Sequence, residues 1–331
     1  MADYQIFVGI DISKNHLDIC ISKGLEVKKE QRIDNNIKSI LDFIDKEKSN
    51  YDFKKAIFCM EATGQYSNHL LASLAKHNLA IWLENAVEIK RSLGLQRGKN
   101  DKVDAQRIAQ YAYRFSDKIK LYKAENKTLK QVRALYQLRE QLVETRKRLK
   151  TSINEQKLFM DKDIFKSIQK YNEKTIKHLD SQIQKVEEKI EASLKNDQTL
   201  QELYEYINSV QGVGKVSTWA ILIVTEAFTK FENPKQFACY SGVAPFENSS
   251  GKFKGKSKVS NMANKKIKKL LHICAVNAVK HEGDLKDYYQ RKIKEGKAKM
   301  SILNAVRNKI IHRIFACVKN QRKYVAKGLV L

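Results

Sequence analysis

Short apolar runs alternate with segments of helical apolar spacing over the first 120 residues. Each run has the length of one strand and ends at polar or glycine positions. The runs predict strands over residues 4–11, 17–22, 54–64 and 79–86, and residues 25–33 are predicted to form a further, more polar strand. Apolar residues three or four positions apart predict helices over residues 37–48, across Leu70, Leu71 and Leu74, and across Asp101 and Asp104.

The order of these elements indicates the class of the first domain. Three strands come first, and strands and helices then alternate, which is typical of a mixed α/β sheet. We therefore expect residues 1–120 to form an α/β domain of the ribonuclease-H-like kind.

Residues 121–205 follow a different pattern, with apolar residues on two heptad seams. The seams comprise Leu135, Leu138, Leu142 and Leu149, and then Ile176, Leu179, Ile183, Val186 and Ile190. An antiparallel coiled coil of two long helices accounts for both seams. The pair is either a plain core element or a dimerisation arm, and its polar flanks favour the arm.

Residues 206–331 are predicted to be mainly helical. Two apolar helices flank Gly212-Val213-Gly214, and the stretch resembles a helix-hairpin-helix. Glycines at such a turn let a phosphate approach closely, and the N–H groups of the next helix, starting near Lys215, point at it. A structural tight turn accounts for the same residues. A polar loop over residues 240–261 and a basic helix over residues 264–280 follow, with His272 on that helix's inner face.

Basic residues dominate the charge and are concentrated near the end of the chain. The 331 residues include 63 Lys and Arg but 37 Asp and Glu, a net charge of +26. Residues 251–331 hold 22 basic and 4 acidic residues, so 18 of the 26 net charges lie there. This asymmetry favours a polyanionic partner. Nucleic acid is preferred to a membrane surface because no amphipathic anchor accompanies the charge.

Composition excludes several other classes of protein. Apolar residues make up 42% of the chain, as in a globular protein, and no apolar stretch approaches the ~20 residues of a membrane span. The first residues lack the pattern of a signal peptide, and the five cysteines lack paired spacing, so we expect reduced, buried thiols in a cytoplasmic, nucleoid-associated protein. The sequence contains no P-loop, dinucleotide fingerprint or zinc motif.

Four acidic residues are candidates for a metal site. Asp11 and Glu61 each end a predicted strand, and the ends of neighbouring strands open into one crevice. Asp101 and Asp104 are three residues apart, so they share one face of a helix. Clustered carboxylates repel each other unless a hard divalent cation such as Mg²⁺ or Mn²⁺ binds them. Taken singly, each acid could be a solvated or capping carboxylate. Asp18 opens a strand on its polar side and is expected to be structural.

A second candidate site is Ser249-Ser250-Gly251 in the basic loop. A serine hydroxyl attacks phosphorus only when a base, a metal ion or nearby cations activate it. Four lysines of the same loop are placed to hold phosphates, namely Lys252, Lys254, Lys256 and Lys258. A flexible polar turn is the plainer interpretation, and Ser241 is a competing candidate.

These motifs together resemble the DEDD-type insertion-sequence transposases, the recombinases guided by a bridge RNA. The resemblance is carried by VGIDISKNHLDICIS, MEATGQY, KNDKVDAQRIAQYA and the long stretch from VQGVGKVSTWAILIVTEAF to SGKFKGKSKVSN. It covers nearly the whole chain in the same order.

The resemblance implies a RuvC-like domain over residues 1–120, a coiled-coil arm over residues 121–205 and a transposase domain over residues 206–331. The metal-binding acids would be Asp11, Glu61, Asp101 and Asp104, and the nucleophile Ser250, which precedes a glycine. It also implies a covalent serine–phosphate intermediate, donor and target DNA, a structured guide RNA, Mg²⁺ or Mn²⁺, and a homo-oligomer, either dimer or tetramer.

Other functions remain compatible with parts of the pattern. A metal-dependent nuclease or Holliday-junction resolvase would use the four acids without a covalent intermediate. A non-catalytic nucleic-acid-binding protein would use only the basic surface. An actin-like sugar kinase also begins with GID, but it would need glycine-rich phosphate turns that this chain lacks.

Overall fold

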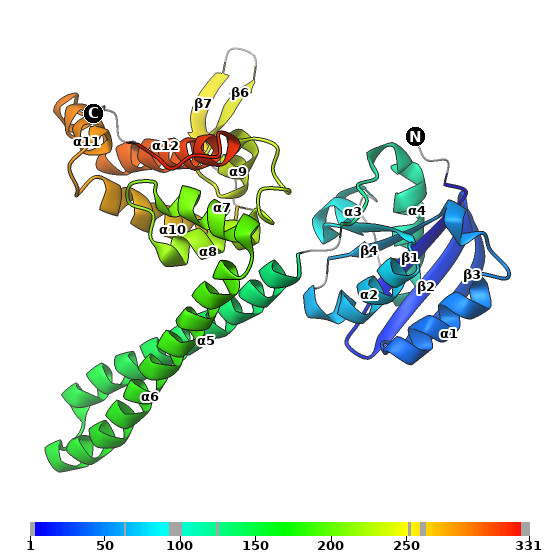
Figure 1. Ribbon diagram of the computed structural model, residues 1–331, viewed down its shortest axis with the longest axis horizontal. Helices are drawn as coiled ribbons and strands as arrows, with labels where there is room; N and C mark the ends of the chain where they lie inside the picture. The colour runs from blue at the N-terminus through cyan, green and yellow to red at the C-terminus, as the bar shows by residue number, and fades with distance from the viewer. Residues whose placement is uncertain are drawn as a thin grey trace. The chain divides into compact units, whose positions relative to one another are not determined.

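The computed structural model describes residues 4–62, 64–92, 101–123, 126–250, 253–258 and 263–325 (Figure 1). The chain forms two compact units, Met1–Ala124 and Glu125–Leu331. The side chains of residues 101–102, 246–250 and 253–258 lie outside this description.

A five-stranded sheet forms the centre of the first unit, in the order β3-β2-β1-β4-β5. The strands are β1 (Ile6–Ile12), β2 (His16–Lys23), β3 (Glu26–Asp34), β4 (Ala56–Glu61) and β5 (Ala80–Glu84). The first three strands form an antiparallel meander, and β4 and β5 are parallel to β1. The predicted mixed α/β sheet is therefore confirmed.

Two helical layers cover the sheet because alternate residues of its strands are apolar on both faces. Val8 and Ile10 of β1 pack in one cluster with α1 (Ile37–Glu47) and α2 (Asn68–Lys76). On the other face, Phe7 packs with residues of α3 (Ala86–Ser92) and α4 (Asp101–Arg114). The helix α3 was not predicted from the sequence.

Helices make up most of the second unit. The first two, α5 (Lys127–Phe159) and α6 (Lys162–Lys195), lie side by side and antiparallel (Figure 1). The others are α7 (Gln198–Asn208), α8 (Lys215–Val224), α9 (Pro234–Tyr240), α10 (Lys265–Ala278), α11 (Asp284–Lys294) and α12 (Lys299–Lys319). The prediction of a helical remainder is thus confirmed.

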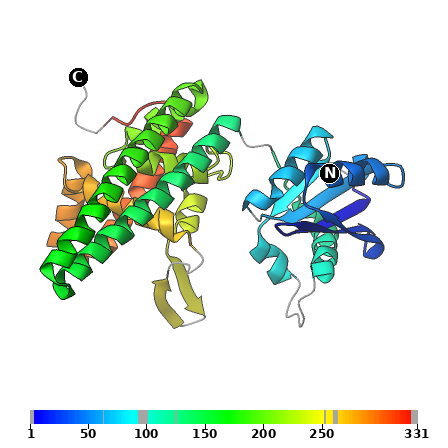
Figure 2. The ribbon, with the colours of Figure 1, turned by 90° about the horizontal axis from the view of Figure 1, so that it is seen from below.

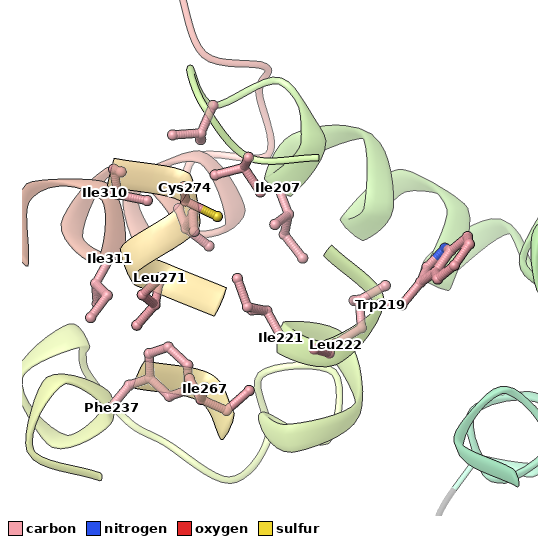
Figure 3. Packing of buried hydrophobic residues seen from close by; sticks show 14 of the residues in the cluster. Ile207, Trp219, Ile221, Leu222, Phe237, Ile267, Leu271, Cys274, Ile310 and Ile311 are labelled. Atoms are coloured by element: carbon pink, nitrogen blue, oxygen red, sulfur yellow. The ribbon is translucent and has the colours of Figure 1, made fainter. Parts of the chain in front are cut away.

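The long helix pair shares its core with the helices that follow it. Leu129 and Val132 of α5 and Ile190 and Leu194 of α6 belong to the same buried cluster as Trp219 of α8. Figure 3 shows the centre of this cluster, where α8, α9, α10 and α12 meet. The far end of the pair is open instead, and Phe159 is 88% exposed. One end of the pair is therefore a core element, and the other leaves the core.

A β-hairpin interrupts the helices of the second unit. It consists of β6 (Phe246–Ser250) and β7 (Phe253–Lys258), which pair antiparallel. The hairpin extends beyond the neighbouring helices of its unit in both views (Figures 1 and 2). The sequence predicted a polar loop here, because serine, lysine and glycine favour strands weakly.

Two compositional expectations have structural counterparts. All five cysteines are free thiols, and four of them are buried. None of the helices in the described ranges combines the length and apolar character needed to cross a membrane.

Candidate functional site: acids at the carboxyl ends of parallel strands

Asp11 and Glu61 lie on adjacent parallel strands. The register of β1 and β4 runs from Ile6 opposite Ala56 to Ile10 opposite Met60, and the two acids are the next residue on each strand. Their backbones are therefore neighbours at the carboxyl ends of the strands, where open α/β sheets place their sites. Both residues are half-buried.

Both acids lie on the face of the sheet that α4 covers. Phe7 of β1 and Cys59 of β4 belong to the cluster on that face. Side chains alternate along a strand, so Asp11 and Glu61 point to the same side as Phe7 and Cys59.

The helix α4 runs antiparallel to β1 and very close to it. A Cβ atom on Gly9 would lie 2.2 Å from the carbonyl oxygen of Ala105, so only glycine allows this approach. Near the end of α4, the ring of Tyr113 contacts Phe7, with centroids 5.2 Å apart. One helical turn before Ala105 is about 6 Å, which matches the step from Gly9 to Asp11. The first turn of α4, with Asp101 and Asp104, thus lies towards the Asp11 end of the sheet.

One acid of this set is held by a neighbour on its own helix. Asp104 forms an ion pair with Arg107, 2.6 Å from Oδ1 to Nη1, within one turn of α4. The side chain of Asp101 lies outside the described residues. Among the side chains that are described, no group of three or more His, Cys, Asp or Glu is placed to hold a metal ion. The donor set itself is suitable for Mg²⁺ or Mn²⁺, since all four residues offer carboxylate oxygens.

Asp18 is a buried neighbour of Asp11, contrary to its expected position on a polar side. It lies directly opposite Asp11 on β2 and is 4% exposed. Arg32 holds it with two hydrogen bonds of 2.9 Å, from Nε to Oδ1 and from Nη2 to Oδ2. Opposite residues of an antiparallel pair share one face. The Arg32 guanidinium therefore offsets the repulsion that Asp18 would exert on Asp11.

Glu84 is a further acid at this edge that the sequence analysis missed. It ends β5 and pairs in register with Glu61. The hydroxyl of Tyr111 on α4 donates to Glu84 Oε2 at 3.3 Å. Burial, and then Glu84, raise the pKa of Tyr111, which keeps the phenol protonated as a donor. In the sequence, Glu84 carries the same signal as Asp11 and Glu61, because each is an acid at the end of a buried apolar run.

Ser250 is the last residue of β6, where it pairs in register with Phe253, and Ser249 pairs with Lys254. Lys256 and Lys258 also lie on β7, whereas Gly251 and Lys252 lie outside the described residues. Ser241 is different, because it is fully buried and its hydroxyl donates to the carbonyl of Phe237 at 2.7 Å. The hydroxyl of Ser241 therefore satisfies a carbonyl in the last turn of α9.

The turn between α7 and α8 packs against α10. Gly212 has a φ of +85°, and a Cβ atom there would lie 2.4 Å from the carbonyl oxygen of Cys274. Gly214 is the N-cap of α8 and has open space around it. Lys215 Nζ lies 3.0 Å from Glu187, which raises the pKa of Lys215. Gly212 thus serves the packing of α10, and Lys215 already has a carboxylate partner.

The two glycines give a matched test of this turn. We expect Gly212→Ala to lower the free energy of unfolding by about 3 kcal/mol, because a left-handed φ and a backbone overlap add. Gly214→Ala should change it by less than about 1 kcal/mol. Urea unfolding of both variants measures this, and equal losses would contradict the packing described here.

Comparison with known proteins assigns both ends of the chain to one group. A transposase model of the DEDD type named for IS110 matches residues 8–157, and a second, described as transposase IS116/IS110/IS902 family, matches residues 204–290. The chain is 23% identical over 326 residues to a pilin gene-inverting protein of Moraxella lacunata, which covers 97% of this chain and 98% of that protein. The corresponding protein of Moraxella bovis is 22% identical over the same length.

Proposed function

Because the chain belongs to the IS110 family of DEDD transposases, we propose that it cuts and rejoins DNA through a serine–phosphate intermediate beside a divalent-cation site. The observation that supports this most is the arrangement of the first unit. Asp11 and Glu61 are adjacent at the carboxyl ends of β1 and β4, and α4 runs with its first turn towards them.

Asp11, Glu61, Asp101 and Asp104 would hold the cation, which neutralises charge on the reacting phosphate when bound. The protein's own part is to hold these oxygens at one end of a rigid sheet. Arg107 forms an ion pair with Asp104. Arg32 forms an ion pair with Asp18, which lies beside Asp11. Both arginines limit the repulsion among acids while no cation is bound.

Ser250 would be the nucleophile. Its Oγ bonds to phosphorus, the bond from phosphorus to the 3′ oxygen breaks, and that oxygen takes up a proton to become a free 3′ hydroxyl. Attack by a 3′ hydroxyl on the phosphoserine reverses the exchange and frees the serine. The ester conserves the energy of the broken bond, so the reaction needs no ATP.

The charge distribution supports a large nucleic-acid partner. Residues 251–331 carry 22 basic and 4 acidic residues, enough to hold several backbone phosphates. We propose donor and target DNA and a guide RNA as these partners, with base pairing supplying the sequence specificity. We also propose a homo-oligomer in which Ser250 and the acids form shared sites, and DNA inversion like that named for the Moraxella relatives.

A covalent-adduct assay tests this function. The full chain is incubated with Mg²⁺, a plasmid carrying the DNA that flanks its gene, and RNA transcribed from those flanks. After denaturation, protein joined to a DNA 5′ end, sensitive to protease and lost in EDTA, is the expected result. Cleaved DNA with free ends and no attached protein would indicate a metal-dependent nuclease or junction resolvase instead.

A further inference from the structure

Arg307 on α12 is a buried arginine without a carboxylate partner among the described residues. It is 5% exposed. Its Nη2 lies 2.8 Å from His272 Nδ1, and its Nη1 lies 3.3 Å from Asn304 Oδ1. Its Nε has no hydrogen-bond partner in the part of the chain that the structure describes. Arg313, two turns further along α12, is instead paired with Asp284.

The partners of Arg307 do not balance its charge. A guanidinium donates only, so His272 must accept at Nδ1 and is therefore a neutral imidazole. Burial, and then Arg307, lower the pKa of His272, which agrees with this state. A buried charge without a counter-ion is costly, and buried charges in proteins are normally paired. The site therefore has the chemistry of an anion site.

A second cation and an amide lie at the short turn that follows α9, and the amide is that of Asn304, a partner of Arg307. Asn304 Nδ2 donates to the carbonyl of Val243 at 2.8 Å. Lys268 Nζ lies 3.7 Å from the position of a Cβ atom on Gly242. We call Lys268, His272, Asn304 and Arg307 the Arg307 cluster. Lys268 and His272 are only half-buried, so the cluster can be reached from their side.

The cluster lies at the root of the β6–β7 hairpin. Val243 is three residues before β6, the strand that ends at Ser250. The helices that carry the cluster are fixed by the core, where Leu271 of α10 lies beside Ile311 of α12 (Figure 3). An anion bound there would be held by rigid elements beside the segment that leads to the hairpin.

We propose that the Arg307 cluster binds a backbone phosphate of a nucleic acid, and so anchors a strand at the root of the hairpin. A phosphodiester satisfies the free guanidinium donors, and arginine is the residue best suited to its oxygens. The identity of the polyanion rests on the proposed function. The need for an anion rests only on the contacts of Arg307.

The experiment compares Arg307→Met with Arg313→Met in the full chain. Thermal unfolding is followed in chloride and in inorganic phosphate at equal ionic strength. We expect phosphate to raise the Tm of the unchanged chain by about 3 °C or more near saturation. Arg307→Met should keep or raise the Tm in chloride and lose the phosphate effect. Arg313→Met should lower the Tm in both salts and keep that effect.

Binding of duplex DNA and of single-stranded RNA identifies the source of the phosphate. On the nucleic acid that uses the cluster, Arg307→Met should weaken binding about tenfold, with a slope of log affinity against log salt smaller by about 0.9 for duplex or 0.7 for single strands. A loss on either nucleic acid supports the proposal. Equal affinities on both, or a Tm in chloride that falls as for Arg313→Met with the phosphate effect kept, would overturn it.

If Arg307→Met does not fold, Arg307→Lys tests whether the Arg307 cluster binds phosphate. Lysine keeps the charge but replaces the planar fork by one ammonium group. A smaller phosphate effect supports the site, and an unchanged one overturns it. The phosphate measurement involves no strand exchange, so it stands even if the proposed recombinase function fails.

Discussion

Asp11→Asn is expected to lower the rate of DNA cleavage by about 10³-fold. The change keeps the shape of the side chain but removes one carboxylate from the end of β1. A cation that stabilises the reacting phosphate lowers the activation free energy by several kcal/mol. Each 1.36 kcal/mol of activation free energy is a factor of ten in rate. Adduct formation with the plasmid substrate, measured against time and Mg²⁺ concentration, gives the rate.

The control for this variant is Asp117→Asn, which removes an exposed acid from the same unit. It should leave the rate within about twofold, since exposed charges contribute little. The Tm of Asp11→Asn, measured alongside, shows whether a loss of rate comes from the site or from unfolding. Cleavage within tenfold of the unchanged chain would remove Asp11 from the site.

Ser250→Ala should abolish the protein–DNA adduct, with strand exchange reduced by at least about 10⁴-fold. No other group replaces an attacking hydroxyl once it is removed, so the loss should match that of other nucleophile variants. The adduct assay and sequencing of recombined plasmids measure the two effects. DNA binding should stay within about twofold.

Ser249→Ala is the matched control, because the two serines are adjacent on β6. It should retain most of the activity. The reverse result, in which Ser249→Ala is inactive and Ser250→Ala is active, would assign the nucleophile to Ser249. Full activity in both variants would exclude the covalent mechanism.

The sequence predicted the sheet of the first unit well because its signals are local. Four apolar runs and one more polar segment became its strands, and the acids at the ends of β1 and β4 marked the candidate site. Glu84 carries the same signal on β5, since it too is an acid at the end of a buried run.

Contacts between distant segments could not be predicted in this way. The approach of α4 to β1 depends on Gly9 meeting Ala105, and nothing near Gly9 in the chain indicates it. The burial of Asp18 depends on Arg32 of the next strand. Likewise, the contact of Arg307 with a neutral histidine, and with no carboxylate among the described side chains, appears only when α10 and α12 are packed together.

Contacts between distant segments were equally hard to predict in the second unit. Heptad seams predicted the two long helices, but not that Leu129 and Ile190 would join the core of the later helices. The β6–β7 hairpin is held by backbone pairing. Its side chains are mostly polar, so their pattern gives almost no prediction of this pairing.

We expect one divalent-cation site to be formed by four carboxylates, those of Asp11, Glu61, Asp101 and Asp104. A crystal of the full chain with DNA and Mn²⁺, measured for anomalous scattering at the manganese edge, tests it directly. We expect manganese about 2 Å from carboxylate oxygens of these residues, with a phosphate oxygen of the DNA completing the shell. Manganese bound elsewhere, with these four carboxylates pointing apart beside the DNA, would contradict it.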